Sequence, residues 1–179
     1  MNALRTVKTV LDRSLEVLVM VVVAVLVLDV LWQVFTRFVL GDPSTWTEEL
    51  AVFLLVWVSL LGAAVALNRG AHLGIDYFVG KLPDRTRLAT EVVVFLCVAA
   101  FSLLVMVVGG IQLVAGTLEL EQISAAMHVK MGYVYLAVPI SGSFLTLYAL
   151  IGLAERIREL LKGHSTPGEH ATSRDVGID

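Results

Sequence analysis

Charged residues are scarce in this chain. Only 16% of its 179 residues are Asp, Glu, Lys or Arg, whereas a soluble domain of this size has about 25%. Hydrophobic residues make up 58% of the chain, and the mean hydropathy is +0.85. Because the apolar residues lie in long uncharged runs, the sequence predicts an integral membrane protein. The net charge is −3 and no basic cluster is present, so nucleic acid is not an expected partner.

Residues for cofactor binding and catalysis are also missing. The single cysteine, Cys97, lies in an apolar run, which excludes a disulfide framework and a cysteine metal motif. A glycine-rich phosphate loop, a Ser-His-Asp set and a zinc motif are absent. A four-helix anchor for haem needs paired histidines at membrane depth, but His72 and His128 fall in predicted loops, and His164 and His170 in the tail. We therefore expect no enzyme activity, metal or cofactor.

Four apolar runs are each long enough to cross a hydrocarbon layer of about 30 Å. A signal peptide is rejected, because the apolar run from Val17 to Leu28 continues past Leu31 without a small-residue cleavage site. The sequence predicts an all-α membrane protein in which residues 1–162 form one four-helix unit, followed by a polar cytoplasmic tail, 163–179. The predicted spans are about 15–38, 47–68, 91–117 and 131–153.

The distribution of cations predicts the orientation. Three lie near the amino terminus, four in the 68–90 loop and three directly after the last span, between residues 154 and 162, whereas the other two loops have one each. The positive-inside rule then places both termini and the 68–90 loop in the cytoplasm. These cations are Arg5, Lys8 and Arg13; Arg69, Lys81, Arg85 and Arg87; Arg156, Arg158 and Lys162; and, in the other two loops, Arg37 and Lys130.

The second span begins with acidic residues and ends with a basic one. Thr45 and Glu48 have the spacing of a capping box, and Glu48 and Glu49 lie in the first turn, where the helix dipole favours negative charge. The helix is expected to stop at Asn68-Arg69-Gly70.

Polar residues interrupt the first span. Asp29, Gln33 and Arg37 follow one another at intervals of four, which predicts a common helix face. A carboxylate inside a membrane should face protein or water rather than lipid. It could form an ion or proton site, or a polar seam to another helix in which Gln33 and a partner satisfy Asp29. The seam is favoured, because no second acid at membrane depth follows.

Two further features concern packing. Small residues along the second span predict close approach of a neighbouring helix, although such residues are also common in spans generally. Pro139 inside the fourth span predicts a kink. The small residues are Ser59, Ala63, Ala66 and Gly70, with Gly62 adjoining.

The short turn after the first span predicts an antiparallel hairpin that brings Arg37, Glu48 and Glu49 to the same level. The two acids either clamp Arg37 or stay free for cations on a partner. The remaining alternative is that Glu48 caps its helix and Glu49 is solvated.

Several motifs resemble the small membrane subunit of TRAP transporters, the tripartite ATP-independent periplasmic transporters of bacteria and archaea. The resemblance covers about residues 10–160. In the segment from Ser124 to Pro139, Ser124, Tyr135 and Pro139 match the family pattern, whereas Ala125, His128 and Lys130 replace the Pro, Gly and Pro often found there. The other matching stretches are Gln33-Val-Phe-Thr-Arg37-Phe-Val, Trp46-Thr-Glu48-Glu49-Leu50, Leu54-Leu55-Val-Trp57, Gly62-Ala63-Ala64 and Arg69-Gly70-Ala-His72-Leu-Gly-Ile-Asp76.

The resemblance implies a small permease subunit of a sodium-coupled transporter in the bacterial inner membrane. It would scaffold a large multi-span permease, which carries the substrate and sodium sites, and help dock a periplasmic solute-binding protein that delivers organic acids such as dicarboxylates, sialic acid or 2-oxo acids. A self-assembling small channel or exporter, with Asp29 lining its pore, is the competing hypothesis. The candidate subunit-interface or docking residues are Asp29, Gln33, Arg37, Trp46, Glu48, Glu49, Ser59, Gly62, Ala63, Ala66, Arg69, His72, Asp76 and Pro139.

Overall fold

The computed structural model describes residues 2–42, 44–69 and 84–162, and most of these residues are helical. The π-helical segments η1 and η2 continue neighbouring α-helices without a break. The elements are α1 (Asn2–Phe35), η1 (Thr36–Leu40), α2 (Thr45–Asn68), α4 (Asp84–Phe101), η2 (Ser102–Gly109), α5 (Gly110–Glu119), α6 (Met131–Tyr135) and α7 (Ala137–Lys162).

Four helical segments are long and apolar enough to cross a membrane: Thr9–Leu40, Thr45–Asn68, Leu88–Glu119 and Met131–Leu161. In the described residues the only extended pairing is a single bridge between Ile123 and Lys130. The predicted fold class, all-α with four membrane-spanning helices, is therefore confirmed. Several segments extend beyond the apolar runs, because polar turns at their ends remain helical.

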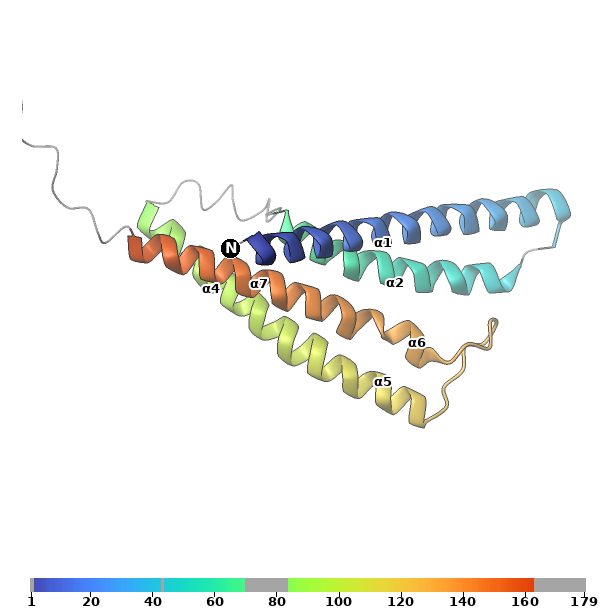
Figure 1. Cartoon of the computed structure of the whole chain (residues 1–179). Coiled ribbons are helices and arrows are strands. Elements are labelled where there is room, and N and C mark those ends of the chain that lie inside the picture. Colours follow the sequence, from blue (N-terminus) through green and yellow to red (C-terminus); the bar gives the residue numbers. More distant parts are fainter. Residues whose placement is uncertain (1, 43, 70–83, 163–179) are drawn as a thin grey trace, which may run out of the picture.

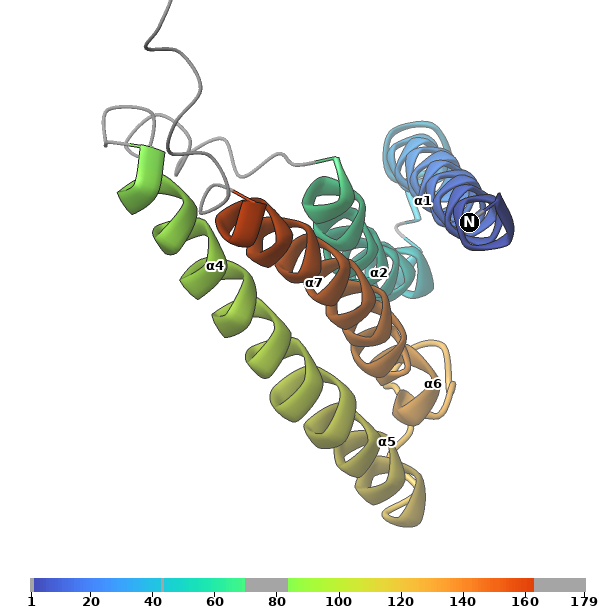
Figure 2. The same cartoon turned by 60° about the vertical axis from the view of Figure 1, so that its left-hand side comes forward.

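The spans stand in a row rather than around a common axis (Figures 1 and 2). Helix α1 packs chiefly on α2, α2 on α7, and α7 on α4 and η2, while α5 packs on α6. In the most apolar stretch of the first span only 6% of the residues are buried, whereas 33% are buried in that of the fourth span. Helix α1 therefore forms an edge of the row, and α7 lies inside it.

The hydrophobic core cluster lies toward the end of the molecule where α1 begins and α7 ends. The third and fourth spans, α4–η2–α5 and α6–α7, form a second hairpin. Toward the α5–α6 end, this second hairpin and the α1–α2 hairpin separate (Figure 1). The core cluster takes residues from both hairpins: Leu15, Leu61, Ala64, Leu67, Ala99, Tyr148 and Ala149.

The inner face of α1 has a seven-residue repeat, as in a left-handed helix pair. The expectation that Asp29 and Arg37 share this face is wrong, because Thr36 is buried and Arg37 is exposed. Each step of four residues overshoots a full turn, so Arg37 lies about 80° around the helix from Asp29, whereas Thr36 lies about 20° away. The face consists of Leu15, Val19, Val22, Leu26, Asp29, Gln33 and Thr36.

Glycines bring the third and fourth spans together. A Cβ atom added to Gly142 would lie 2.6 Å from the Cβ atom of Met106, so the two helices touch there through backbone. In the same way Gly132 lies against Leu118, Gly152 against Phe95, and Gly110 against Pro139. Close packing of this kind is what holds helices together in lipid.

The fourth span is interrupted at Leu136, between α6 and α7. Pro139 follows three residues later and has no N–H to donate to the preceding turn. The interruption is consistent with the kink that Pro139 predicts, and the buried proline ring fills the space left by Gly110.

Candidate docking and subunit-contact site

Glu49, in the first turns of α2, binds the loop between α5 and α6. The backbone N–H of Ala125 donates to Oε1 at 3.0 Å, and the N–H groups of Ala126 and Met127 donate to Oε2 at 2.9 and 2.8 Å. Hydrogen bonds to a carboxylate are stronger than those between neutral groups. One side chain of the first hairpin thus holds three consecutive residues of the second.

The loop is also bonded to itself. The N–H of Ser124 donates to the carbonyl oxygen of Val129 at 2.9 Å, and the N–H of Val129 donates to Ser124 Oγ at 3.3 Å. Glu121 and His128 have positive φ angles of 47° and 55°. His128 stands where the family resemblance has glycine, the residue that adopts this conformation most readily.

The predicted clamp between Arg37 and the acids of α2 is wrong for Glu49, because the loop occupies both of its carboxylate oxygens. Arg37 is exposed and forms no ion pair with any residue that the structure describes. The alternative of a solvated Glu49 is wrong as well. Sequence reasoning missed the contact because the groups that bind Glu49 are backbone amides 76 to 78 residues away, and amides have no side-chain signature.

The capping box at Thr45 is also wrong. Ser44 is the N-cap, and Thr45 is already the first helical residue. The Thr47 hydroxyl donates to the Ser44 carbonyl oxygen at 2.7 Å, and the two hydroxyls lie 2.6 Å apart. Glu48 is exposed in the first turn, where the helix dipole still favours its charge.

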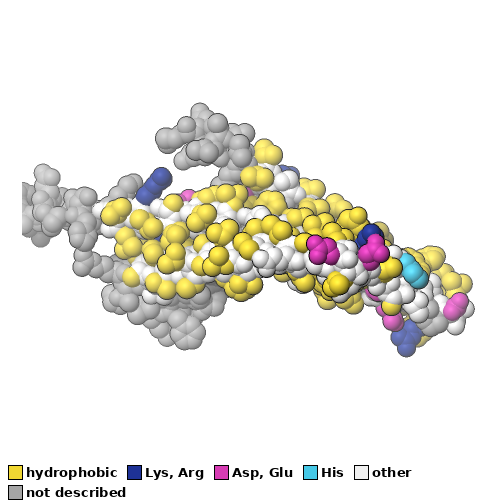
Figure 3. All heavy atoms as spheres, turned by 90° about the horizontal axis from the view of Figure 1, so that it is seen from below, with side chains coloured by type: hydrophobic (Ala, Val, Ile, Leu, Met, Phe, Trp, Pro, Cys, Tyr) yellow, Lys and Arg dark blue, Asp and Glu magenta, His cyan; other side chains and the backbone are white. Residues whose placement is uncertain are grey.

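Around the Glu49 contact lies a mixed surface, which we call the loop-end surface: Trp46, Glu48, Ile123, His128 and Lys130. All five side chains are exposed. In Figure 3 hydrophobic side chains cover most of the visible face, and acidic, basic and histidine side chains gather at the right-hand end, toward the α5–α6 loop. Apolar and charged groups side by side suit contact with a soluble partner.

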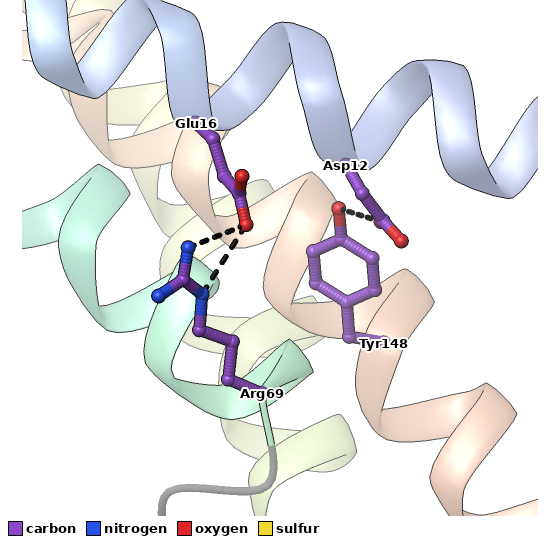
Figure 4. Close-up of polar contacts among 4 residues, drawn as sticks. All are labelled: Asp12, Glu16, Arg69 and Tyr148. Atoms are coloured by element: carbon purple, nitrogen blue, oxygen red, sulfur yellow. Dashed lines mark hydrogen bonds and ion pairs between the residues drawn. The ribbon is translucent and has the colours of Figure 1, made fainter.

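At the opposite end, α1 is held by two polar contacts (Figure 4). Arg69 donates from Nη2 and Nε to Oε1 of Glu16 at 2.8 and 3.2 Å, and the Tyr148 hydroxyl donates to Oδ1 of Asp12 at 2.8 Å. Arg69, a candidate for contact with a partner, therefore already has a partner within the chain. Asp12 and Glu16 were not among the predicted contact residues, although their spacing of four residues places them on one face of α1.

Tyr148→Phe should lower the free energy of unfolding by about 1.5–3 kcal/mol, the usual contribution of one hydrogen bond to a charged group. Glu16→Gln should cost at most about 1 kcal/mol, because the Arg69 side chain is 65% exposed and its ion pair is screened. Thermal unfolding in detergent measures both, with the exposed Glu119→Gln as the control. A larger loss for Glu16→Gln than for Tyr148→Phe would contradict this ranking.

The other candidates differ in their surroundings. Ser59, Ala63 and Ala66 are exposed and a Cβ on Gly62 would meet open space, so within the described chain this strip packs against no helix. Asp29 is buried and Gln33 half-buried. His72, Asp76 and Gly70 lie outside the described residues. Within the described ranges, no three His, Cys, Asp or Glu side chains come together as a metal site would require.

The family model for the DctQ component of tripartite ATP-independent periplasmic transporters matches residues 26–159. The chain belongs to this family. It is thus a small permease subunit of a TRAP transporter and a multi-pass membrane protein, and the resemblance seen in its sequence is confirmed.

Relatives agree with this membership. The sialic acid TRAP transporter small permease protein SiaQ of Vibrio cholerae is 29% identical over 163 residues, which are 89% of this chain and 88% of that protein. The C4-dicarboxylate small permease protein DctQ of Rhodobacter capsulatus is 28% identical over 105 residues, 59% of this chain and 46% of that protein. The isethionate permease protein DctMQ of Oleidesulfovibrio alaskensis is 27% identical over 115 residues, which are 64% of this chain but 18% of that much longer protein.

Proposed function

We propose that this subunit scaffolds the large permease of a sodium-coupled TRAP transporter for organic acids and helps to dock its periplasmic binding protein. The observation that carries the proposal is the row of helices, which leaves α1 and the small-residue strip of α2 uncovered in the isolated chain. In DctMQ a segment similar to this chain is part of a much longer permease chain, which supports a large permease as the partner.

The cation distribution supports an orientation with both termini in the cytoplasm of a bacterial inner membrane. The loop-end surface then faces the periplasm, where a binding protein arrives. The Glu49 contact supports the docking role, since a surface loop held by a carboxylate presents one defined shape.

The substrate class rests on the relatives' names. These concern sialic acid, C4-dicarboxylates and isethionate, all of which are small organic anions. We propose an organic acid for this system, recognised by residues of the large permease and the binding protein. Family membership favours this function over the self-assembling channel.

Uptake measurements in proteoliposomes test the proposal. The large permease with its binding protein should take up the organic acid only when this chain is present and a sodium gradient is applied. The isolated chain should bind no solute in calorimetry, and liposomes containing it alone should not conduct. Uptake without this chain, or conduction by this chain alone, would refute the proposed function.

A further inference from the structure

Asp29 is a buried acid without a partner in the membrane-spanning part of α1. Its side chain is 6% exposed, and neither carboxyl oxygen has a hydrogen-bond partner in the described structure. A carboxyl group in an apolar surrounding is costly unless a donor satisfies it. The predicted polar seam is thus only half present: Asp29 lies in the α1–α2 seam, but Gln33 does not satisfy it.

Within residues 2–42, 44–69 and 84–162, no donor reaches Asp29. The hydroxyl of Thr36, on the same face of α1, donates to the carbonyl oxygen of Gln33 at 2.9 Å. Because Glu16 meets Arg69 in the antiparallel hairpin, Asp29 lies opposite the middle of α2. Between Leu50 and Leu67 the only side-chain donors are Ser59, which is exposed, and Trp57, whose indole N–H does not reach Asp29.

A buried polar pair elsewhere in the fold provides the contrast. The Thr146 hydroxyl lies 2.9 Å from Ser102 Oγ and 2.7 Å from the carbonyl oxygen of Gly142, and the Ser102 hydroxyl lies 3.2 Å from the carbonyl oxygen of Ala99. Both hydroxyls therefore have hydrogen-bond partners where the third and fourth spans meet. Asp29 instead lies in the edge helix, which packs chiefly on α2 and has its remaining surface uncovered. Leu28, Leu31 and Trp32, beside Asp29, are all exposed.

We propose that Asp29 receives its hydrogen bond from the large permease. A transmembrane helix of that subunit lies along the exposed edge of α1 and presents a side-chain donor at the depth of Asp29. Since both oxygens lie inside the seam in the isolated chain, Asp29 changes its side-chain rotamer to meet this donor. This inference rests on the proposed function and adds to it a contact residue and the chemistry of the contact.

Two measurements on matched variants test it: recovery of the large permease with the tagged full-length chain, and thermal unfolding of that chain alone in detergent. Asp29→Leu should lower recovery of the complex several-fold, while the melting temperature of the chain alone stays the same or rises, because the variant removes an unsatisfied group. Thr146→Val should lower the melting temperature of the chain alone, because it breaks a bond within the chain. Asp29→Asn should preserve the complex if the donor is neutral and lose it if the donor is a cation.

Unchanged recovery with Asp29→Leu, or a loss of chain stability in proportion to the loss of complex, would overturn the proposal. A photoreactive residue in place of Leu31 gives a second readout that leaves Asp29 intact. It should cross-link to the large permease, whereas the same group in place of Val105, in η2, should not. Failure of the unmodified chain to recover any large permease would refute the proposed function instead.

Discussion

Glu49→Ala should free the α5–α6 loop and remove most of the uptake activity, while Glu48→Ala should leave both nearly unchanged. The two variants delete the same charge from adjacent residues. Only Glu49 accepts hydrogen bonds from Ala125, Ala126 and Met127, whereas Glu48 is exposed in the first turn of α2. A difference between the variants therefore reports the contact with the loop and not the loss of an acid.

Hydrogen exchange measures the release of the loop directly. In Glu49→Ala the amides of residues 125–127 should exchange roughly tenfold faster or more, since the loss of one hydrogen bond to a charged acceptor already corresponds to that factor. Glu49→Gln should be intermediate, because its side chain keeps one acceptor oxygen and turns an N–H₂ group toward the loop amides.

Uptake at increasing concentrations of binding protein separates docking from assembly. If the loop-end surface docks the binding protein, Glu49→Ala should raise the concentration needed for half-maximal uptake while the complex with the large permease is recovered in normal amounts. Equal exchange rates in Glu48→Ala and Glu49→Ala would contradict the structural contact. Faster exchange with unchanged uptake would refute the docking role and leave Glu49 as a fold-stabilising residue.

Gly142→Ala should destabilise the chain by about 1–3 kcal/mol, the usual cost of overpacking. The added methyl group would lie 2.6 Å from the Cβ atom of Met106 and 3.2 Å from its backbone carbonyl carbon, so the two helices must move apart. This contact lies next to the buried pair of Thr146 and Ser102, which the same movement would weaken. Thermal unfolding of the purified chain in detergent measures the effect.

Gly62→Ala is the matched control, because it makes the same substitution in a helix where a Cβ atom meets nothing within 4 Å. Replacing glycine by alanine inside a helix is by itself favourable, by up to about 1 kcal/mol. Gly62→Ala should thus leave the chain alone equally stable or slightly more stable. Similar stability changes in the two variants would show that the third and fourth spans are not packed through Gly142.

The sequence by itself determined the membrane class, the four spans and the family. These features are local or compositional: an uncharged run of about 20 residues satisfies its backbone hydrogen bonds within one helix and matches the thickness of a bilayer, whatever its neighbours are. The family motifs around Glu49 and Ser124 were likewise visible as short stretches. Their relation to each other was not visible, although the structure joins the two stretches through the Glu49 carboxylate.

Tertiary structure decided which residues meet, because a contact between helices depends on register and rotation, and spacing within one helix specifies neither. The rotation of α1 places Thr36 toward α2 and leaves Arg37 exposed. The order of the helices in the row leaves the small residues of α2 uncovered, whereas Gly142 in α7 packs against Met106. Glu49 binds backbone amides instead of a cation, because the folded loop brings three N–H groups to its carboxylate. In the part of the chain that the structure describes, Asp29 has no hydrogen-bond donor, because the part of α2 that faces it is apolar.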